Sequence, residues 1–178
     1  MRYWLEKELA KESGSASYLH QLDEPFLLAR LMDYADGDVG IFSGEFDVDW
    51  YEKQLANSDF KNLMPIASPD GVGWNCFGDN SRIVDCARQI AHGEVDDDTT
   101  EFVDVEYIKS IESKLPDHEI KKLIIQTSES TTAPRILDGN HHAVACALHY
   151  VKTGELLPMQ AYIGVKRIPL VKNTIQTR

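Results

Sequence analysis

The chain has 178 residues, 43% of them hydrophobic and 26% charged, and its formal net charge at pH 7 is −11. This length fits one domain or two small ones, and it suffices for a core without disulfide bonds. The acidic balance argues against duplex DNA as a partner, because DNA-binding domains normally present a basic surface to the phosphates, although a local basic patch stays open. No stretch approaches the roughly 18 apolar residues of a membrane span, so no membrane partner is expected.

The cysteines and the amino-terminal residues indicate the compartment. The first residues, MRYWLEKELAKES, are charged and amphipathic, unlike a secretory signal. Cys76, Cys86 and Cys146 show neither CxxC nor zinc-finger spacing, and their odd number favours a reducing environment. We therefore predict a cytoplasmic protein.

Apolar spacing and turn residues predict an α+β fold. In the first half of the chain they predict helices over 1–12 and 23–35, a helix over 50–56 with Asp49 as its cap, a hairpin of two strands over 63–68 and 73–77, and a helix over 82–92 that Gly93 ends. In the second half they predict a helix over 106–115, strands over 123–128 and 135–137, a helix over 141–154 and a strand over 159–165.

The order of these elements repeats along the chain. Residues placed sixty apart match at Ser68 and Ser128, Asn80 and Asn140, Val84 and Val144, Cys86 and Cys146, and Ala87 and Ala147. We predict a helical extension over 1–43, followed by two copies of a strand–hairpin–turn–helix unit over 44–101 and 102–178. The two copies could form separate units or one compact domain. Chance identity between two amphipathic helices is the alternative. Cys86 and Cys146 are predicted to be buried core residues.

The stretch most suited to chemistry is Asp138-Gly139-Asn140-His141-His142, between a strand and an apolar helix. Asp-Gly favours a turn with positive φ, and a helix start favours anions, phosphate in particular. Asp138 could position a hydroxyl group or a metal ion, Asn140 could donate to a phosphate or a base, and His141 and His142 could contact phosphate or carry a proton. The alternative is structural: Asp138 caps the helix, Gly139 serves the turn, and both histidines face solvent.

A metal site at the histidine pair is not expected. Successive side chains on a helix diverge by about 100°, so His141 and His142 do not chelate one ion readily. No HExxH, GxxxxGK[ST] or GxGxxG motif occurs.

The predicted order of strand, hairpin, glycine turn and helix around LDGNHHAVACAL resembles the core of the ParB/sulfiredoxin superfamily. The motif is most similar to the Asp-Gly-His-His-Arg form of the free serine kinases. The resemblance covers about residues 102–166 and, more weakly, residues 46–95. It implies that Gly139 and the following residues bind a nucleotide phosphate. The match departs from the family in two places, since Asn140 stands where His is commoner and His142 stands where the family has Arg.

The resemblance implies further site residues. The serine kinases use an upstream catalytic glutamate, and Glu119 is similar in local sequence but closer to the motif than is usual. The earlier turn, Gly78-Asp79-Asn80-Ser81-Arg82, carries the arginine that the later one lacks, so Gly78, Asn80, Ser81 and Arg82 are further candidates for phosphate binding.

Three functions follow as hypotheses. The first is a nucleotide- or phosphate-binding protein, as a phosphotransferase or nucleotidase that uses ATP or CTP with Mg²⁺, with Asp138, His141 and Glu119 as catalytic residues. The second is a non-catalytic acidic binding or inhibitor protein on the same fold, with a protein as its partner. The third is a ParB-like DNA-processing module, which the net charge of −11 disfavours.

Overall fold

The computed structural model describes Leu5 and residues 48–66, 73–97, 100, 103–117, 119–128 and 133–166. The chain divides into two compact units, Met1–Asp47 and Val48–Arg178. The helices predicted over 1–12 and 23–35 and the predicted boundary at residue 43 fall outside the described residues, apart from Leu5. The second unit is an α+β structure, as predicted.

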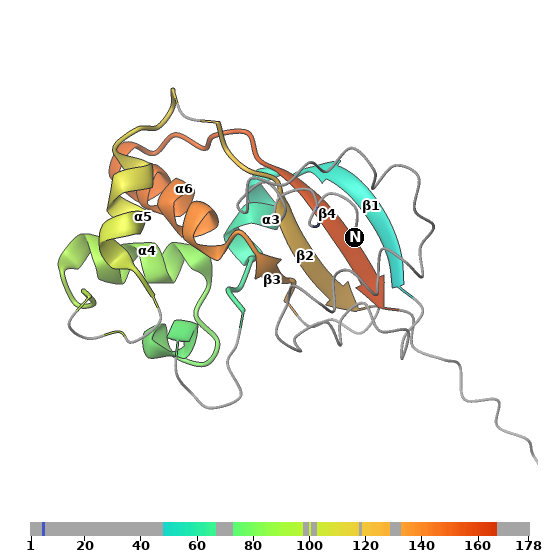
Figure 1. The fold of residues 1–178 in the computed structure, drawn as a ribbon, viewed down its shortest axis with the longest axis horizontal. Coiled ribbons are helices and arrows are strands. Elements are labelled where there is room, and N and C mark those ends of the chain that lie inside the picture. The colour runs from blue at the N-terminus through green and yellow to red at the C-terminus, as the bar shows by residue number, and fades with distance from the viewer. Residues whose placement is uncertain are drawn as a thin grey trace, which may run out of the picture. The chain divides into compact units, whose positions relative to one another are not determined.

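The second unit is built on a mixed sheet of four strands in the order β1-β4-β2-β3 (Figure 1). The strands are β1 (Val48–Gln54), β2 (Leu123–Ser128), β3 (Arg135–Asp138) and β4 (Gln160–Lys166). β4 pairs antiparallel with β1 and parallel with β2, and β2 pairs antiparallel with β3. Beyond β3, Met64 forms a parallel bridge with Arg135. The predicted strands over 123–128, 135–137 and 159–165 are confirmed.

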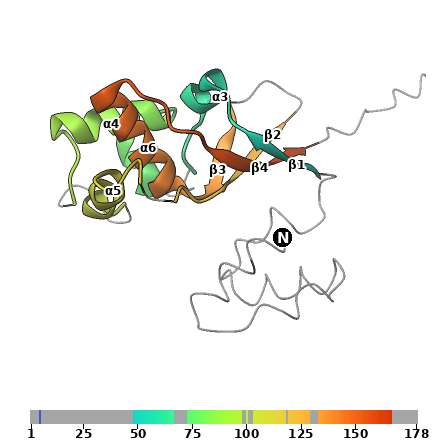
Figure 2. The same cartoon turned by 90° about the horizontal axis from the view of Figure 1, so that it is seen from above.

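Three of the helices pack together at one end of the strands (Figure 2). They are α4 (Ile83–His92), α5 (Val105–Glu112) and α6 (Asn140–Thr153), and a short helix, α3 (Asn57–Asn62), follows β1. Left-handed glycines end two of them, with φ of 70° at Gly93 after α4 and 78° at Gly154 after α6. The helices predicted over 82–92, 106–115 and 141–154 are confirmed.

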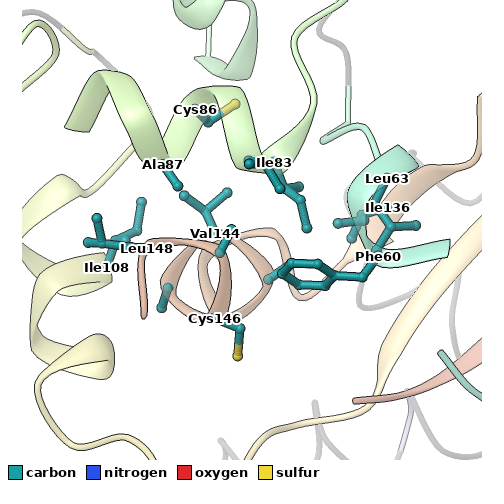
Figure 3. Packing of buried hydrophobic residues seen from close by; sticks show 14 of the residues in the cluster. Phe60, Leu63, Ile83, Cys86, Ala87, Ile108, Ile136, Val144, Cys146 and Leu148 are labelled. Carbon is teal, nitrogen blue, oxygen red and sulfur yellow. The ribbon is translucent and has the colours of Figure 1, made fainter. Parts of the chain in front are cut away.

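The core lies where α6 meets its neighbours. Val144 of α6 faces Ile83 and Ala87 of α4, and Leu148 lies beside Ile108 of α5 (Figure 3). Cys86 and Cys146 are 0% and 1% exposed, and burial raises the pKa of each thiol to about 12. Both cysteines are therefore core residues, as predicted.

The helix predicted over 50–56 is wrong. These residues begin in β1, which pairs along its whole length with β4, from Val48 opposite Lys166 to Gln54 opposite Gln160. Trp50 packs closely on the opposite strand, because a Cβ added at Gly164 would lie 2.8 Å from the indole ring. Pairing between residues more than a hundred positions apart overrides the local helical pattern, and Asp49 is a strand residue rather than a cap.

The predicted hairpin of residues 63–68 and 73–77 is also wrong. Residues 73–77 form a 3-10 helix, η3 (Gly73–Phe77), that begins at a glycine with φ of 66°. This turn places Trp74 and Phe77 in the core, where their rings stack with centroids 5.9 Å apart. Of the described part of 63–68, only Met64 makes a β-bridge.

The two predicted copies of the repeat therefore differ. DVDWYEKQL lies largely in β1, whereas the similar DVEYIKSI lies largely in α5. β1 from the first predicted copy pairs with β4 from the second, so both contribute to one sheet. The matched residues Val84 and Val144 do occupy corresponding helices, α4 and α6.

Within the described residues, no helix has the length and apolar character needed to cross a membrane.

Candidate functional site

The turn that leads into α6 requires a glycine. Gly139 has φ of 89° and is the N-cap of α6, so no side chain at that position caps the helix. A Cβ at Gly139 would lie 2.7 Å from Cδ2 of Leu123, the first residue of β2. The backbone of the turn thus packs tightly against β2, which fixes the start of α6 relative to the sheet.

The neighbouring start of α5 is closed by carboxylates. Asp97 accepts hydrogen bonds from the backbone N–H groups of Val105 at 2.6 Å and Glu106 at 3.2 Å. The carboxylate of Asp104, the N-cap, accepts from the N–H of Tyr107 at 2.6 Å. Since these acceptors already occupy the N–H groups of α5, this helix start offers little to an external anion.

His141 lies between the starts of the two helices. Its Nε2 accepts a long hydrogen bond of 3.4 Å from the backbone N–H of Asp104, which places the proton of the neutral ring on Nδ1. Its ring contacts those of Trp74 and Tyr107, with centroid distances of 5.1 and 5.7 Å. Burial lowers the pKa of His141, while the carboxylate of Asp104 opposes this shift. The imidazole is therefore neutral at pH 7.

Asn140 and His142 are part of the packed structure. Asn140 is 8% exposed, and its Oδ1 accepts a hydrogen bond of 2.9 Å from the backbone N–H of Ile66, which ties the segment after α3 to the start of α6. His142 is 6% exposed and lies edge-on to the ring of Tyr107, 6.3 Å away. Neither histidine is a fully solvent-exposed side chain, so that part of the structural alternative is wrong.

Asp138 and Glu119 occupy different settings. Asp138 accepts a hydrogen bond of 2.8 Å from the N–H of Gly139, so its carboxylate lies at the turn itself. Glu119 is exposed, and it lies four residues before Leu123, the first residue of β2. Within the described residues, no hydrogen bond or ion pair joins Glu119 to residues 138–142. Glu119 is therefore a candidate on the grounds of its local sequence alone.

The earlier turn makes local contacts. Gly78 has φ of 104°, and its carbonyl accepts from the N–H of Ser81 at 3.0 Å. The hydroxyl of Ser81 donates to the carbonyl of Phe77. Arg82 is the exposed N-cap of α4 and donates its backbone N–H to Asp85, and Asn80 is exposed. Among the described residues, no hydrogen bond or ion pair joins this turn to residues 138–142, although Trp74 of η3 contacts His141.

The part of the chain that the structure describes holds no group of three or more His, Cys, Asp or Glu residues arranged to bind a metal ion. No protein-family model, curated protein or solved structure matches the chain.

Sequence reasoning missed several neighbours of the turn. Trp74 and Tyr107 contact His141 only because η3 and α5 fold against α6, and no local pattern indicates these contacts. The cap at Asp104 had a local signal, since an aspartate directly precedes the helical residues VEYI. The site that results has a helix start, a neutral imidazole and two nearby aspartates, Asp104 and Asp138.

Proposed function

We propose that the chain binds a phosphate group, as the free ion or as part of a nucleotide, at residues 138–142. The observation that carries the proposal is the start of α6, where a left-handed glycine with no side chain introduces a helix of 14 residues. Such a helix start presents backbone N–H groups and a partial positive charge to an anion.

His141 would be the principal side chain for the ligand. In its neutral form it donates through Nδ1–H and does not act as a permanent cation, unlike the arginine found in the similar families. When protonated at lower pH, it would add a positive charge to the helix start. We therefore expect phosphate affinity to rise as the pH falls through the lowered pKa of His141.

The aspartates at the site favour a nucleotide that carries a divalent cation. Asp104 lies beside His141, and Asp138 lies at the turn, so a bare phosphate would meet two negative charges. A bound Mg²⁺ would reduce this repulsion, as in enzymes of phosphoryl transfer. ATP or CTP with Mg²⁺ is therefore our proposed ligand, by resemblance to the ParB/sulfiredoxin superfamily.

A phosphotransferase or nucleotidase activity is the finer part of the proposal. Asp138 would hold the attacking hydroxyl group, the water or the metal ion, and His141 would donate from Nδ1–H to the transferred phosphate, because its Nε2 already accepts from the N–H of Asp104. Within the described residues Glu119 makes no hydrogen bond or ion pair with residues 138–142, so we give it no role in binding.

Calorimetric titration of the full chain with ATP, ADP, CTP, GTP and inorganic phosphate, each with and without Mg²⁺, tests the proposal. We expect saturable binding of at least one nucleotide and weaker binding by His141→Gln. His92→Gln is the matched control, because His92 is exposed at the far end of α4. If none of these ligands binds, the proposal fails.

A non-catalytic binding protein is the second candidate. It is favoured by the use of Asn140 and His142 within the folded structure, because both are buried and Asn140 already accepts from Ile66. A nucleotide that binds without turnover, together with a phosphate-dependent protein partner, would support this candidate. Release of phosphate that His141→Gln abolishes would exclude it.

A further inference from the structure

A cleft of about 280 Å³ opens between α3 and the sheet, on the side of the sheet that carries Ile125 of β2 and Ile163 of β4. Its apolar floor includes Leu63 and Ile125, which are 1% and 0% exposed, and the half-buried Ile163. The volume lies just below the usual range for ligand sites, about 300–1,000 Å³. At about 30 Å³ per water-sized group, it holds roughly nine non-hydrogen atoms.

Polar groups stand at separate places on the rim of the cleft. Lys53 of β1 forms an ion pair of 2.7 Å with Asp59 of α3. Lys53 pairs with Ala161 of β4, which in turn pairs with Leu123 at the start of β2. Thr127 lies four residues after Leu123, which is about 13 Å along β2 at 3.3 Å per residue. The cleft is therefore elongated, with an ion pair near one end, a hydroxyl group near the other and apolar side chains between them.

The ion pair retains hydrogen-bonding capacity. Oδ2 of Asp59 accepts from both Lys53 and the backbone N–H of Ala56, at 2.7 and 3.1 Å. Within the described part of the chain, Oδ1 of Asp59 and the hydroxyl of Thr127 have no hydrogen-bond partner. The ammonium of Lys53 has three N–H groups and uses one of them for Asp59.

The charges of the pair select against ionised ligands. The nearby ammonium of Lys53 lowers the pKa of Asp59, so the carboxylate stays ionised at neutral pH. A ligand carboxylate that reached Lys53 would meet Asp59, and a ligand ammonium that reached Asp59 would meet Lys53. A group that both donates and accepts hydrogen bonds matches the pair without meeting a like charge.

We propose that this cleft binds an uncharged amphiphile of about nine non-hydrogen atoms, whose alkyl or single-ring body lies on Leu63, Ile125 and Ile163 and whose carboxamide or hydroxyl end contacts Lys53 and Asp59. The proposal is independent of the phosphate site, since none of residues 138–142 lines the cleft.

Amide-resolved NMR titration of the full chain with hexanamide, hexanoate and hexylammonium tests this site. We expect hexanamide to shift the backbone amides of Ile125, Thr127 and Ile163 saturably. Each charged probe should bind more weakly, because its attraction to one member of the ion pair is offset by repulsion from the other while its charged group loses hydration in the cleft. Equal affinities for the three probes, or unshifted signals at these amides with hexanamide, would overturn the proposal.

A variant that removes one charge of the ion pair should change the affinity of a charged probe for the cleft. Lys53→Met keeps an unbranched side chain, one atom shorter, but removes the ammonium, which leaves Asp59 as the only charged residue among those that line the cleft. Hexylammonium should then bind about fivefold more tightly than it binds the unaltered chain. Lys114→Met, at an exposed lysine after α5, should leave the order of the probes unchanged. If Lys53→Met also leaves the order unchanged, the ion pair does not contact the ligand.

Discussion

Replacement of Gly139 by alanine would test how the start of α6 is fixed. Gly139 has φ of 89°, a conformation that side chains with a Cβ adopt at a cost, and the new methyl group would stand 2.7 Å from Cδ2 of Leu123. Leu123 is fully buried at the beginning of β2, so it cannot move away into solvent. The substitution therefore combines backbone strain with overpacking of the core.

The two effects can be estimated separately. The left-handed conformation costs about 1–2 kcal/mol for a residue with a Cβ. Insertion of an extra methyl group into a packed core costs about 1–3 kcal/mol. Gly139→Ala should thus lower the free energy of unfolding by about 2–5 kcal/mol. Gly154→Ala, at the other end of α6, should cost only the strain of about 1–2 kcal/mol, because nothing lies within 4 Å of its Cβ position.

Urea unfolding of the two glycine variants measures this difference. In the background of Leu123→Ala, which removes the contacting methyl groups, the cost of Gly139→Ala should fall to that of Gly154→Ala. Equal losses of stability for Gly139→Ala and Gly154→Ala in the unaltered background would refute the close contact between the turn and β2.

Three further predictions concern side chains around the same helix starts. Burial lowers the pKa of His141 below 6.5, so the unfolded chain binds this proton more readily and stability should fall as the pH falls below about 6.5. In urea unfolding followed across pH, His141→Phe should reduce this dependence of stability on pH. An unchanged slope would contradict the prediction. Asn140→Ala should cost about 1–3 kcal/mol because the N–H of Ile66 loses its acceptor, and Asn140→Asp should recover part of this in the same assay. Asp97→Ala should lower the free energy of unfolding by about 1–2 kcal/mol, since two N–H groups of α5 lose their acceptor. The exposed control Asp117→Ala should change it by no more than about 0.5 kcal/mol. Similar losses for both variants would argue against this cap.

Local pattern predicted the elements whose apolar periodicity and caps agree with their final packing. In α4, the buried residues follow one helical face and Gly93 ends the helix. In α6, the Asp-Gly turn and Gly154 mark the two ends of the helix, and its apolar composition agrees with the burial of every residue from His142 to His149. β2 is a short apolar run of the kind that a strand in the middle of a sheet requires. These segments carry enough local information to indicate their structure.

The remaining elements depend on distant partners. β1 contains Glu52 and Lys53 and has a helical apolar spacing, but its conformation is set by pairing with β4, whose residues lie at the other end of the chain. Likewise, η3 forms where Trp74 and Phe77 enter the core beside α4 and α6. A local pattern contains no information about such partners, so it predicted a helix and a strand instead.

In the candidate site, too, local sequence predicts some features, whereas others depend on contacts with distant segments. The turn at Gly139 and the following helix could be predicted, because Asp-Gly has a strong conformational preference. The use of Asn140 to bind Ile66 and the packing of His141 between Trp74 and Tyr107 could not, because both depend on how α6 sits among other segments.

The most direct test of the phosphate-binding proposal is an amide-resolved NMR titration of the full chain with ATP and Mg²⁺, repeated with CTP. The account predicts saturable shifts of the backbone amides of Gly139, Asn140 and His141, and weaker binding in His141→Gln but not in His92→Gln. Saturable shifts confined to other parts of the chain, or no saturable shift with either nucleotide, would contradict it.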